Sequence, residues 1–330
     1  MDTSQILDVQ DLRVHFHTLE GTVKAVNGVG FALNKGETLG LVGESGCGKS
    51  VTALTVLRLI PSPPARIASG RVLLNGENLV EASNERMRRI RGGQISMIFQ
   101  EPMTSLNPVF TIGHQIAEVF RIHQKLEGQA LRDATVDVLH KVQIPSAPKR
   151  LKEYPHQLSG GMRQRVMIAM ALACNPEILI ADEPTTALDV TIQAQILDLM
   201  LALREELGTA ILMITHDLGV IAETAQRVVV FYAGKVMESG DVRTIFKKPF
   251  HPYTIGLLDS VPRLGRRSKK GKTRLREIPG IVPSMFDLPG GCLFEPRCRW
   301  SMQICLKERP KLRTLEPGHQ VRCWLDQPPG

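Results

Sequence analysis

The sequence is poor in aromatic residues, and this scarcity argues against a role in binding nucleic acid. Its 330 residues include only two tryptophans and three tyrosines, and none of these lies in the most basic stretch, residues 266–276. Proteins that hold single-stranded nucleic acid stack the bases on aromatic rings set among basic side chains. We therefore expect no nucleic-acid partner. The 41 basic and 33 acidic residues suit a nucleotide or an anionic lipid surface, and residues 266–276 are either a solvated loop or a contact with such lipids.

Long apolar runs and a secretory signal are also missing. No segment approaches the run of about 18 apolar residues that a membrane-spanning helix needs. Residues 1–5 have neither the basic start nor the apolar stretch of a signal peptide. These absences predict a protein that stays in the cytosol, where thiols are kept reduced. The sequence also lacks internal repeats and a second glycine loop.

What the sequence does contain is a complete phosphate-binding loop. Residues 43–50 read GESGCGKS, the pattern G-x-x-x-x-G-K-S, between an apolar segment and the start of a helix. Such a loop turns backbone N–H groups toward the α- and β-phosphates, while the helix N-terminus adds positive potential. Lys49 can reach the β- and γ-oxygens, and Ser50 can hold Mg²⁺. The predicted nucleotide contacts here are Gly43, Glu44, Ser45, Gly46, Cys47, Gly48, Lys49, Ser50 and Val51.

The pattern of apolar residues predicts an α/β fold of the P-loop NTPase type. Short alternating segments within 6–42 and 71–76 indicate antiparallel strands. Helical periodicity within about 104–160 indicates a helical subdomain. Uninterrupted apolar runs at 178–181 and 210–214 are typical of parallel strands buried on both faces.

The weak periodicity near the C-terminus predicts a second region. We place an ATPase domain at residues 1–248 and a small Cys-rich extension at residues 249–330.

Two acids end the apolar strand at 178–181. Asp182 is the candidate for a second Mg²⁺-directed carboxylate, and Glu183 is the candidate for polarising the attacking water. A second phosphate-seeking helix start follows from Ser159, Gly160 and Gly161. Because one loop already serves the phosphates, this second start must face a different nucleotide or close the same one from another subunit.

Together, the segments 43–50, 158–165 (LSGGMRQR) and 178–183 (ILIADE) resemble the ATP-binding subunit of an ABC transporter. In that family the LSGGQ-type signature completes the ATP site of a facing subunit. The resemblance implies that Gln100 touches Mg²⁺ and water and communicates with the membrane subunit. It also implies that residues 187–189, with Asp189, form the D-loop and that His216 lies near the γ-phosphate.

The family usually stacks an aromatic residue on adenine, commonly a tyrosine ahead of the phosphate loop. This sequence has no tyrosine there and offers Phe16 or His17. Either ring can stack, and the sequence leaves both open.

The segments 100–108, 185–195 and 251–254 resemble the dipeptide and oligopeptide importer branch. That branch implies a place on the cytoplasmic face of the inner membrane, two transmembrane permease subunits and a second, usually different, ATPase subunit. It also implies an extracytoplasmic peptide-binding protein. Related importers carry nickel, glutathione or cationic peptides. A soluble ABC-type ATPase is the other alternative, although such proteins usually show two cassettes or a long heptad insertion.

Four cysteines near the C-terminus, Cys292, Cys298, Cys305 and Cys323, have the spacing C-x₅-C-x₆-C-x₁₇-C. Four thiolates in a loop-rich segment suit Zn²⁺ or an iron–sulfur cluster, although paired C-x₂-C knuckles are missing. Disulfides and the absence of a ligand role are further alternatives. The resemblance to the dipeptide-permease family implies a [4Fe–4S] cluster.

Overall fold

The computed structural model describes residues 4–100, 105–186, 188–260 and 277–329. The chain divides into two compact units, each made from several of its segments. The helical unit comprises Met1–Ile6, Leu33–Thr38 and Glu81–Met213, and the P-loop unit comprises Leu7–Ala32, Leu39–Val80 and Ile214–Gly330. The basic stretch 266–276 and residue 187 of the predicted D-loop lie outside the described residues. None of the helices in the described part has both the length and the apolar character that a membrane span requires.

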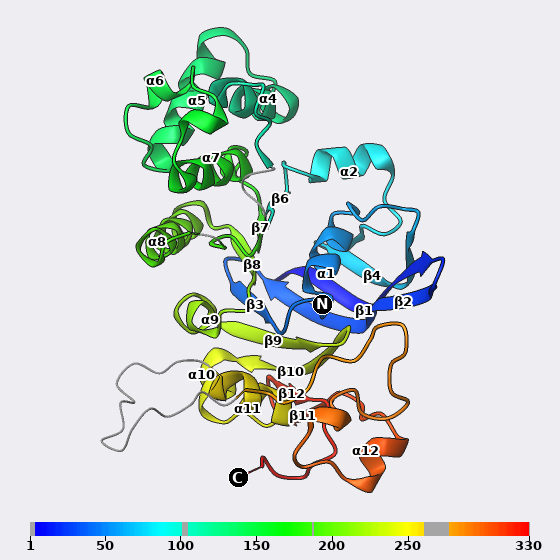
Figure 1. Ribbon diagram of the computed structural model, residues 1–330. Coiled ribbons are helices and arrows are strands. Elements are labelled where there is room, and N and C mark those ends of the chain that lie inside the picture. Colours follow the sequence, from blue (N-terminus) through cyan, green and yellow to red (C-terminus); the bar gives the residue numbers. More distant parts are fainter. Residues whose placement is uncertain (1–3, 101–104, 187, 261–276, 330) are drawn as a thin grey trace, which may run out of the picture. The chain divides into compact units, whose positions relative to one another are not determined.

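The P-loop unit contains the predicted antiparallel strands (Figure 1). Its four-stranded sheet has the order β2-β1-β4-β5, and β4 pairs antiparallel with both of its neighbours. The strands are β1 (Gln5–Thr18), β2 (Gly21–Asn34), β4 (Ala65–Leu74) and β5 (Glu77–Asn78). Alternate residues of β1, such as Leu12 and Val14, are fully buried, as the alternation in the sequence predicts.

A second group of strands in the P-loop unit has the order β11-β12-β10-β9-β3. These strands are β3 (Thr38–Val42), β9 (Arg227–Tyr232), β10 (Lys235–Asp241), β11 (Arg313–Glu316) and β12 (His319–Val321). β3 and β9 are parallel, whereas β9, β10, β12 and β11 pair antiparallel in turn. Because β12 pairs with β10, C-terminal residues continue the same run of strands that begins beside the phosphate loop.

The helices of the P-loop unit lie beside these strands and in the C-terminal region. They are α1 (Lys49–Val56), α9 (Leu218–Thr224), α10 (Val242–Lys247), α11 (Pro252–Asp259), α12 (Gln303–Lys307) and the 3₁₀ turn η2 (Glu295–Arg297). The buried carboxylate of Glu238 in β10 joins the C-terminal elements to the strands. It accepts hydrogen bonds from the backbone N–H groups of Phe250 and His251, and it contacts the His319 ring at 2.8 Å.

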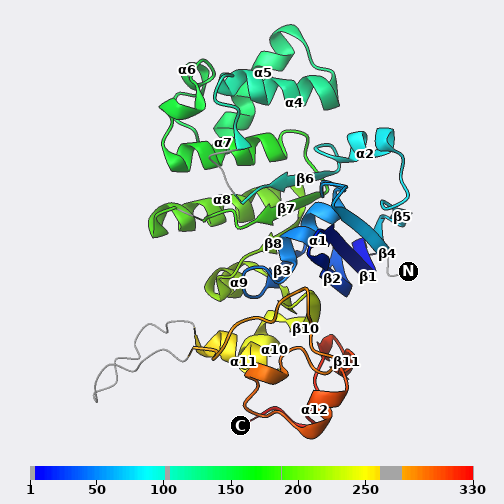
Figure 2. The ribbon, with the colours of Figure 1, turned by 45° about the vertical axis from the view of Figure 1, so that its right-hand side comes forward.

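The helical unit combines three buried strands, in the order β8-β7-β6, with the predicted helices. β6 (Ile95–Ile98) is parallel to β7 (Ile178–Asp182), and every residue of β7 and of β8 (Ala210–Ile214) is buried. The helices are α2 (Asn84–Ile90), α4 (Ile112–Gln124), α5 (Gly128–Lys141), α6 (Ala147–Arg150), η1 (Pro155–Gln157), α7 (Gly160–Leu172) and α8 (Val190–Leu207). Helices α4, α5 and α7 pack against one another (Figure 2).

Candidate active site

The phosphate loop joins β3 to α1 and is shaped by two glycines at which a side chain would meet the backbone of other strands. Gly43 and Gly48 have φ angles of 148° and 101°, values that side chains other than glycine rarely adopt. A Cβ on Gly43 would lie 2.2 Å from the Phe231 carbonyl oxygen, and one on Gly48 would lie 2.4 Å from the Ala25 carbonyl oxygen. The loop therefore passes against the backbone of neighbouring strands. Helix α1 starts directly after Gly48 without a side-chain cap, which leaves its N-terminus suited to an anion.

Lys49 is buried inside the loop that precedes it. Its Nζ donates to the carbonyl oxygens of Gly43 at 2.8 Å and Glu44 at 3.0 Å, and it lies 3.6 Å from Cys47 Sγ. The ammonium thus closes the loop on itself, at the place where phosphate oxygens would compete for it. Burial raises the pKa of the Cys47 thiol in spite of the Lys49 charge, so Cys47 packs there as a small neutral side chain.

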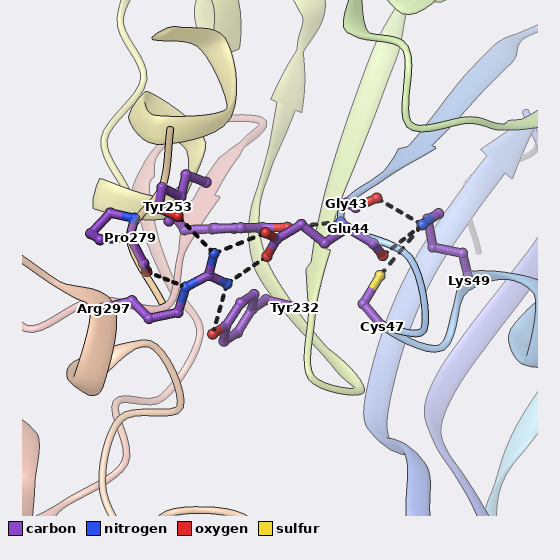
Figure 3. Close-up of polar contacts among 9 residues, drawn as sticks. Gly43, Glu44, Cys47, Lys49, Tyr232, Tyr253, Pro279 and Arg297 are labelled. Carbon is purple, nitrogen blue, oxygen red and sulfur yellow. Dashed lines mark hydrogen bonds and ion pairs between the residues drawn. The ribbon is translucent and has the colours of Figure 1, made fainter. Parts of the chain in front are cut away.

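Glu44 has partners that the sequence did not suggest. Its carboxylate accepts from both terminal nitrogens of Arg297, at 2.7 and 2.9 Å, and its backbone N–H donates to the Tyr253 hydroxyl at 2.9 Å (Figure 3). All three residues belong to the P-loop unit. Segment 251–254 stood out only as a family resemblance, and no periodicity or motif marked Arg297. The contact of Glu44 with Arg297 joins residues 253 positions apart.

His216 and the two adenine candidates also belong to the P-loop unit. The exposed His216 follows Thr215, whose N–H donates to the Leu41 carbonyl of β3 at 3.2 Å. Phe16 is half-buried, whereas His17 is exposed and its Nδ1 lies 3.2 Å from Thr22 Oγ1. Because Phe16 and His17 are adjacent on β1, their side chains point to opposite faces, and only one of them can face a given ligand.

The helical unit brings together two of the predicted catalytic residues. Gln100 Nε2 donates to Glu183 Oε2 at 3.1 Å, and Thr186 Oγ1 donates to the same oxygen at 3.0 Å. Asp182 is buried at the end of β7. Glu183 itself has a φ of 47°, a left-handed conformation that is costly for a side chain of this type and is typical of functional sites. The strand end therefore holds the Glu183 carboxylate in a fixed direction.

The predicted signature residues begin helix α7 in the same unit. Ser159 caps the helix, and its Oγ accepts from the Met162 N–H at 3.3 Å. A Cβ on Gly161 would lie 2.9 Å from Ile192 Cγ2 of α8, and one on Gly160 would lie 3.7 Å from Leu188. The signature thus packs closely against residues around the predicted D-loop, whose Asp189 is exposed at the N-cap of α8.

The prediction of a [4Fe–4S] cluster at Cys292, Cys298, Cys305 and Cys323 is wrong. In the described residues, no group of three or more His, Cys, Asp or Glu side chains is arranged to hold a metal ion. This finding also removes the zinc alternative, and the disulfide alternative is not realised because all four thiols are free. Burial raises the pKa of Cys292 to about 12 and that of Cys298 to about 11, so both thiols keep their protons. The cysteines pack as small apolar side chains, and Cys323 does so against Phe250 and Val321.

Two models of protein families match parts of the chain. The family model for the ABC transporter matches residues 26–186. The family model for the oligopeptide/dipeptide transporter, C-terminal region, matches residues 237–305.

Comparison with individual proteins covers nearly the whole chain. The chain is 53% identical over 321 residues to a probable peptide ABC transporter ATP-binding protein of Sinorhizobium fredii, covering 97% of this chain and 94% of the relative. It is 50% identical over 321 residues to a dipeptide transport ATP-binding protein of Bacillus subtilis, covering 97% and 95%. It is 49% identical over 325 residues to an oligopeptide transport ATP-binding protein of the same organism, covering 98% and 90%.

A solved structure is similar over a shorter span. The dimeric structure of a post-hydrolysis state of an ATP-binding cassette bound to ADP and Pi has a TM-score of 0.64 and 26% identity, and the match covers 72% of this chain and 99% of that one. The loop, the acids and these relatives agree, and ATP and Mg²⁺ are the ligands that the family implies. The chain therefore belongs to the ABC transporter family of ATP-hydrolysing subunits, in the group that carries the oligopeptide/dipeptide transporter C-terminal region.

Proposed function

We propose that this chain powers the import of dipeptides or short oligopeptides by hydrolysing ATP. The proposed cargo rests on one observation. Over nearly its full length, the chain is identical at about half of all positions to peptide, dipeptide and oligopeptide transport ATP-binding proteins. We further propose that residues 1–248 are the ATPase domain, with its helical subdomain at about 104–160, and that residues 249–330 are the extension typical of this group.

In the P-loop unit, we assign nucleotide binding to the phosphate loop. Its glycine-shaped backbone and the start of α1 suit the phosphates, and Lys49 turns from its own loop carbonyls toward the β- and γ-oxygens. Phe16 or His17 stacks on adenine. His216 acts near the γ-phosphate, because it lies at a strand end beside β3.

In the helical unit, we assign the water to Glu183. Its carboxylate orients the attacking water and accepts a proton from it. The hydrogen bonds from Gln100 and Thr186 fix the orientation of that carboxylate. Gln100 and Asp182 are proposed here as Mg²⁺ ligands, acting directly or through water, and in the P-loop unit Ser50 is proposed for the same role. When bound, this ion neutralises charge on the β- and γ-phosphates.

The signature residues Ser159, Gly160 and Gly161, together with Asp189, are proposed to complete the ATP site of a facing ATPase subunit. The ordered Ser159 cap supports this assignment, because a rigid helix start can present its N–H groups to a phosphate. Two ATPase subunits would then close over two ATP molecules. ATP hydrolysis reopens the pair, and the motion passes to the membrane subunits near Gln100.

We propose that the chain works on the cytoplasmic face of the inner membrane. Its partners there are two transmembrane permease subunits and a second, different ATPase subunit, and an extracytoplasmic peptide-binding protein serves the same complex.

Reconstitution of the native complex in vesicles tests the proposed cargo. We expect the binding protein loaded with a di- to pentapeptide to stimulate ATP hydrolysis and peptide uptake together, and we expect Glu183→Gln to abolish both. Nickel ions, glutathione and cationic peptides are added in parallel. Stimulation by one of these and not by neutral short peptides would contradict the peptide proposal and identify the related cargo.

A further inference from the structure

The C-terminal region reaches the phosphate loop through two side chains, those of Arg297 and Tyr253. Arg297 ends the 3₁₀ turn η2 and forms a bidentate ion pair with Glu44, the second residue of the loop, at 2.7 and 2.9 Å. Figure 3 shows the guanidinium lying edge-on to the Glu44 carboxylate. Two parallel charge-assisted hydrogen bonds fix direction as well as distance. The C-terminal region therefore holds the phosphate loop at a defined residue, Glu44, and does not merely pack over it.

The Arg297 guanidinium has several partners besides Glu44. Its Nε donates to the Pro279 carbonyl at 2.9 Å, and one terminal nitrogen lies 3.3 Å from the Tyr232 hydroxyl. The Arg297 side chain is 4% exposed, against 28% for Glu44, and its Cζ lies 5.8 Å from the centre of the Tyr232 ring. A planar group held on several sides loses little freedom when it binds a carboxylate. Arg297 is thus held in place by several groups besides Glu44.

Glu44 is also held through its backbone. The hydroxyl of Tyr253, a fully buried residue of α11, accepts from the Glu44 N–H at 2.9 Å. The Tyr253 ring packs 4.6 Å from that of Tyr232, centre to centre. At the same residue, the Glu44 carbonyl accepts from Lys49 Nζ at 3.0 Å. Glu44 therefore contacts Arg297 and Tyr253 of the C-terminal region and also Lys49, whose ammonium is assigned to the phosphates.

The choice of Glu44 as the point of contact favours a role in positioning the phosphate loop over a role in merely fastening the C-terminal region. The motif G-x-x-x-x-G-K-S leaves the second residue open, so phosphate binding by itself does not require Glu44. An anchor that only fastened the C-terminal region could use any surface, and Arg322 provides such an anchor. Its Nε donates to the Val236 carbonyl of β10 at 2.8 Å and it also bonds the Pro310 carbonyl.

We propose that Arg297 is a positioning residue for ATP binding: through Glu44 it holds the phosphate loop in shape when Lys49 leaves the loop carbonyls for the phosphates. In this structure Lys49 Nζ donates to the carbonyl oxygens of Gly43 and Glu44. With the β- and γ-phosphates present, those two lysine bonds are given up, and Arg297 and Tyr253 remain as the links to Glu44. The inference rests on ATP binding at this loop and not on the identity of the cargo.

Steady-state ATP hydrolysis by the full-length chain in its complex tests this role, with KM and kcat measured separately. A hydrogen bond to a charged group is typically worth enough for about a tenfold change in an equilibrium. We therefore expect Arg297→Met and Glu44→Gln each to raise the KM for ATP about tenfold and to change kcat less than about twofold. Arg297→Lys, which keeps the charge without the bidentate geometry, should recover part of the loss.

Two further variants distinguish positioning from simple anchoring. The double variant Glu44→Gln/Arg297→Met should match either single variant, because both changes remove the same interaction. Arg322→Met is the matched control, and it should leave the KM for ATP within about twofold of the wild-type value.

The proposal is overturned if Arg297→Met and Glu44→Gln keep the wild-type KM, if their effects multiply, or if Arg322→Met raises the KM equally. If Arg297→Met does not fold, Glu44→Gln and Arg297→Lys carry the same comparison. Because these measurements use ATP alone, failure of peptide stimulation in the vesicle experiment would leave their outcome unaffected.

Discussion

The shape of the phosphate loop can be perturbed at Gly43 by a single methyl group. A Cβ there would lie 2.2 Å from the Phe231 carbonyl oxygen, and real Cβ atoms come no closer than 3.0 Å. The difference between 3.0 and 2.2 Å means that Gly43→Ala forces a shift of at least 0.8 Å. The displaced residue also supplies the carbonyl that Lys49 binds at 2.8 Å. Since a misplacement of about 1 Å in a catalytic site can cost about 100-fold in rate, we expect a loss of about that size in kcat/KM for ATP.

Gly46→Ala is the matched control within the same loop. Gly46 also has a positive φ, of 75°, but a Cβ on it meets nothing within 4 Å. The substitution therefore adds only the left-handed backbone penalty of about 1–2 kcal/mol, which corresponds to no more than about 30-fold. ATP hydrolysis and thermal unfolding are measured for both variants, and both should stay folded. If folded Gly43→Ala were as active as Gly46→Ala, the steric reasoning would be refuted.

Three other predictions concern Glu183, its hydrogen-bond partner Gln100 and the buried ion pair of His319 with Glu238. Glu183→Gln should lower kcat, measured by phosphate release, by about 10²- to 10⁴-fold, while a nucleotide-binding assay should show that ATP still binds. A normal rate of phosphate release would show that Glu183 has no catalytic role. Gln100→Ala should lower kcat by about tenfold with a smaller change in KM, because it removes one of the hydrogen bonds to the Glu183 carboxylate; an unchanged kcat would show that this bond does not matter. The hydrogen bond that the His319 ring donates to the Glu238 carboxylate raises the pKa of His319, and nearby Glu316 and Asp241 add to the effect. This stabilisation is complete below the unfolded pKa of about 6.5 and is lost as pH rises through the raised folded value, so Tm should fall from pH 6 to pH 8 more in the wild type than in His319→Gln. Equal pH dependence in the two proteins would contradict the assignment.

Local patterns were sufficient to predict the loop and the acids. A glycine loop needs its residues in one short segment, and the apolar runs that became β7 and β8 are buried throughout. The helices α4 and α5 were also predictable, because Ile116, Phe120 and Val138 recur at helical spacing and are buried.

Contacts between distant segments were not predictable in the same way. The pairing of Arg297 with Glu44 depends on the fold of the C-terminal region, and a single arginine among many has no periodic signal. The four cysteines led to a wrong prediction for a related reason. Their spacing does not reveal how the four side chains are arranged, and in the part of the chain that the structure describes they form no group that could hold a metal ion.

We propose that one nucleotide is held between the phosphate loop of this chain and the signature helix of a facing subunit, and that a second is held between the signature helix of this chain and the loop of that subunit. Retention of labelled ATP on rapid filtration tests this directly, with the Glu183→Gln chain in its native complex and Ser159→Arg added in a second sample. We predict that ATP is retained in the first sample and that the signature substitution releases one of the two bound nucleotides. Equal retention in both samples, or full retention by the isolated chain, would contradict the shared site.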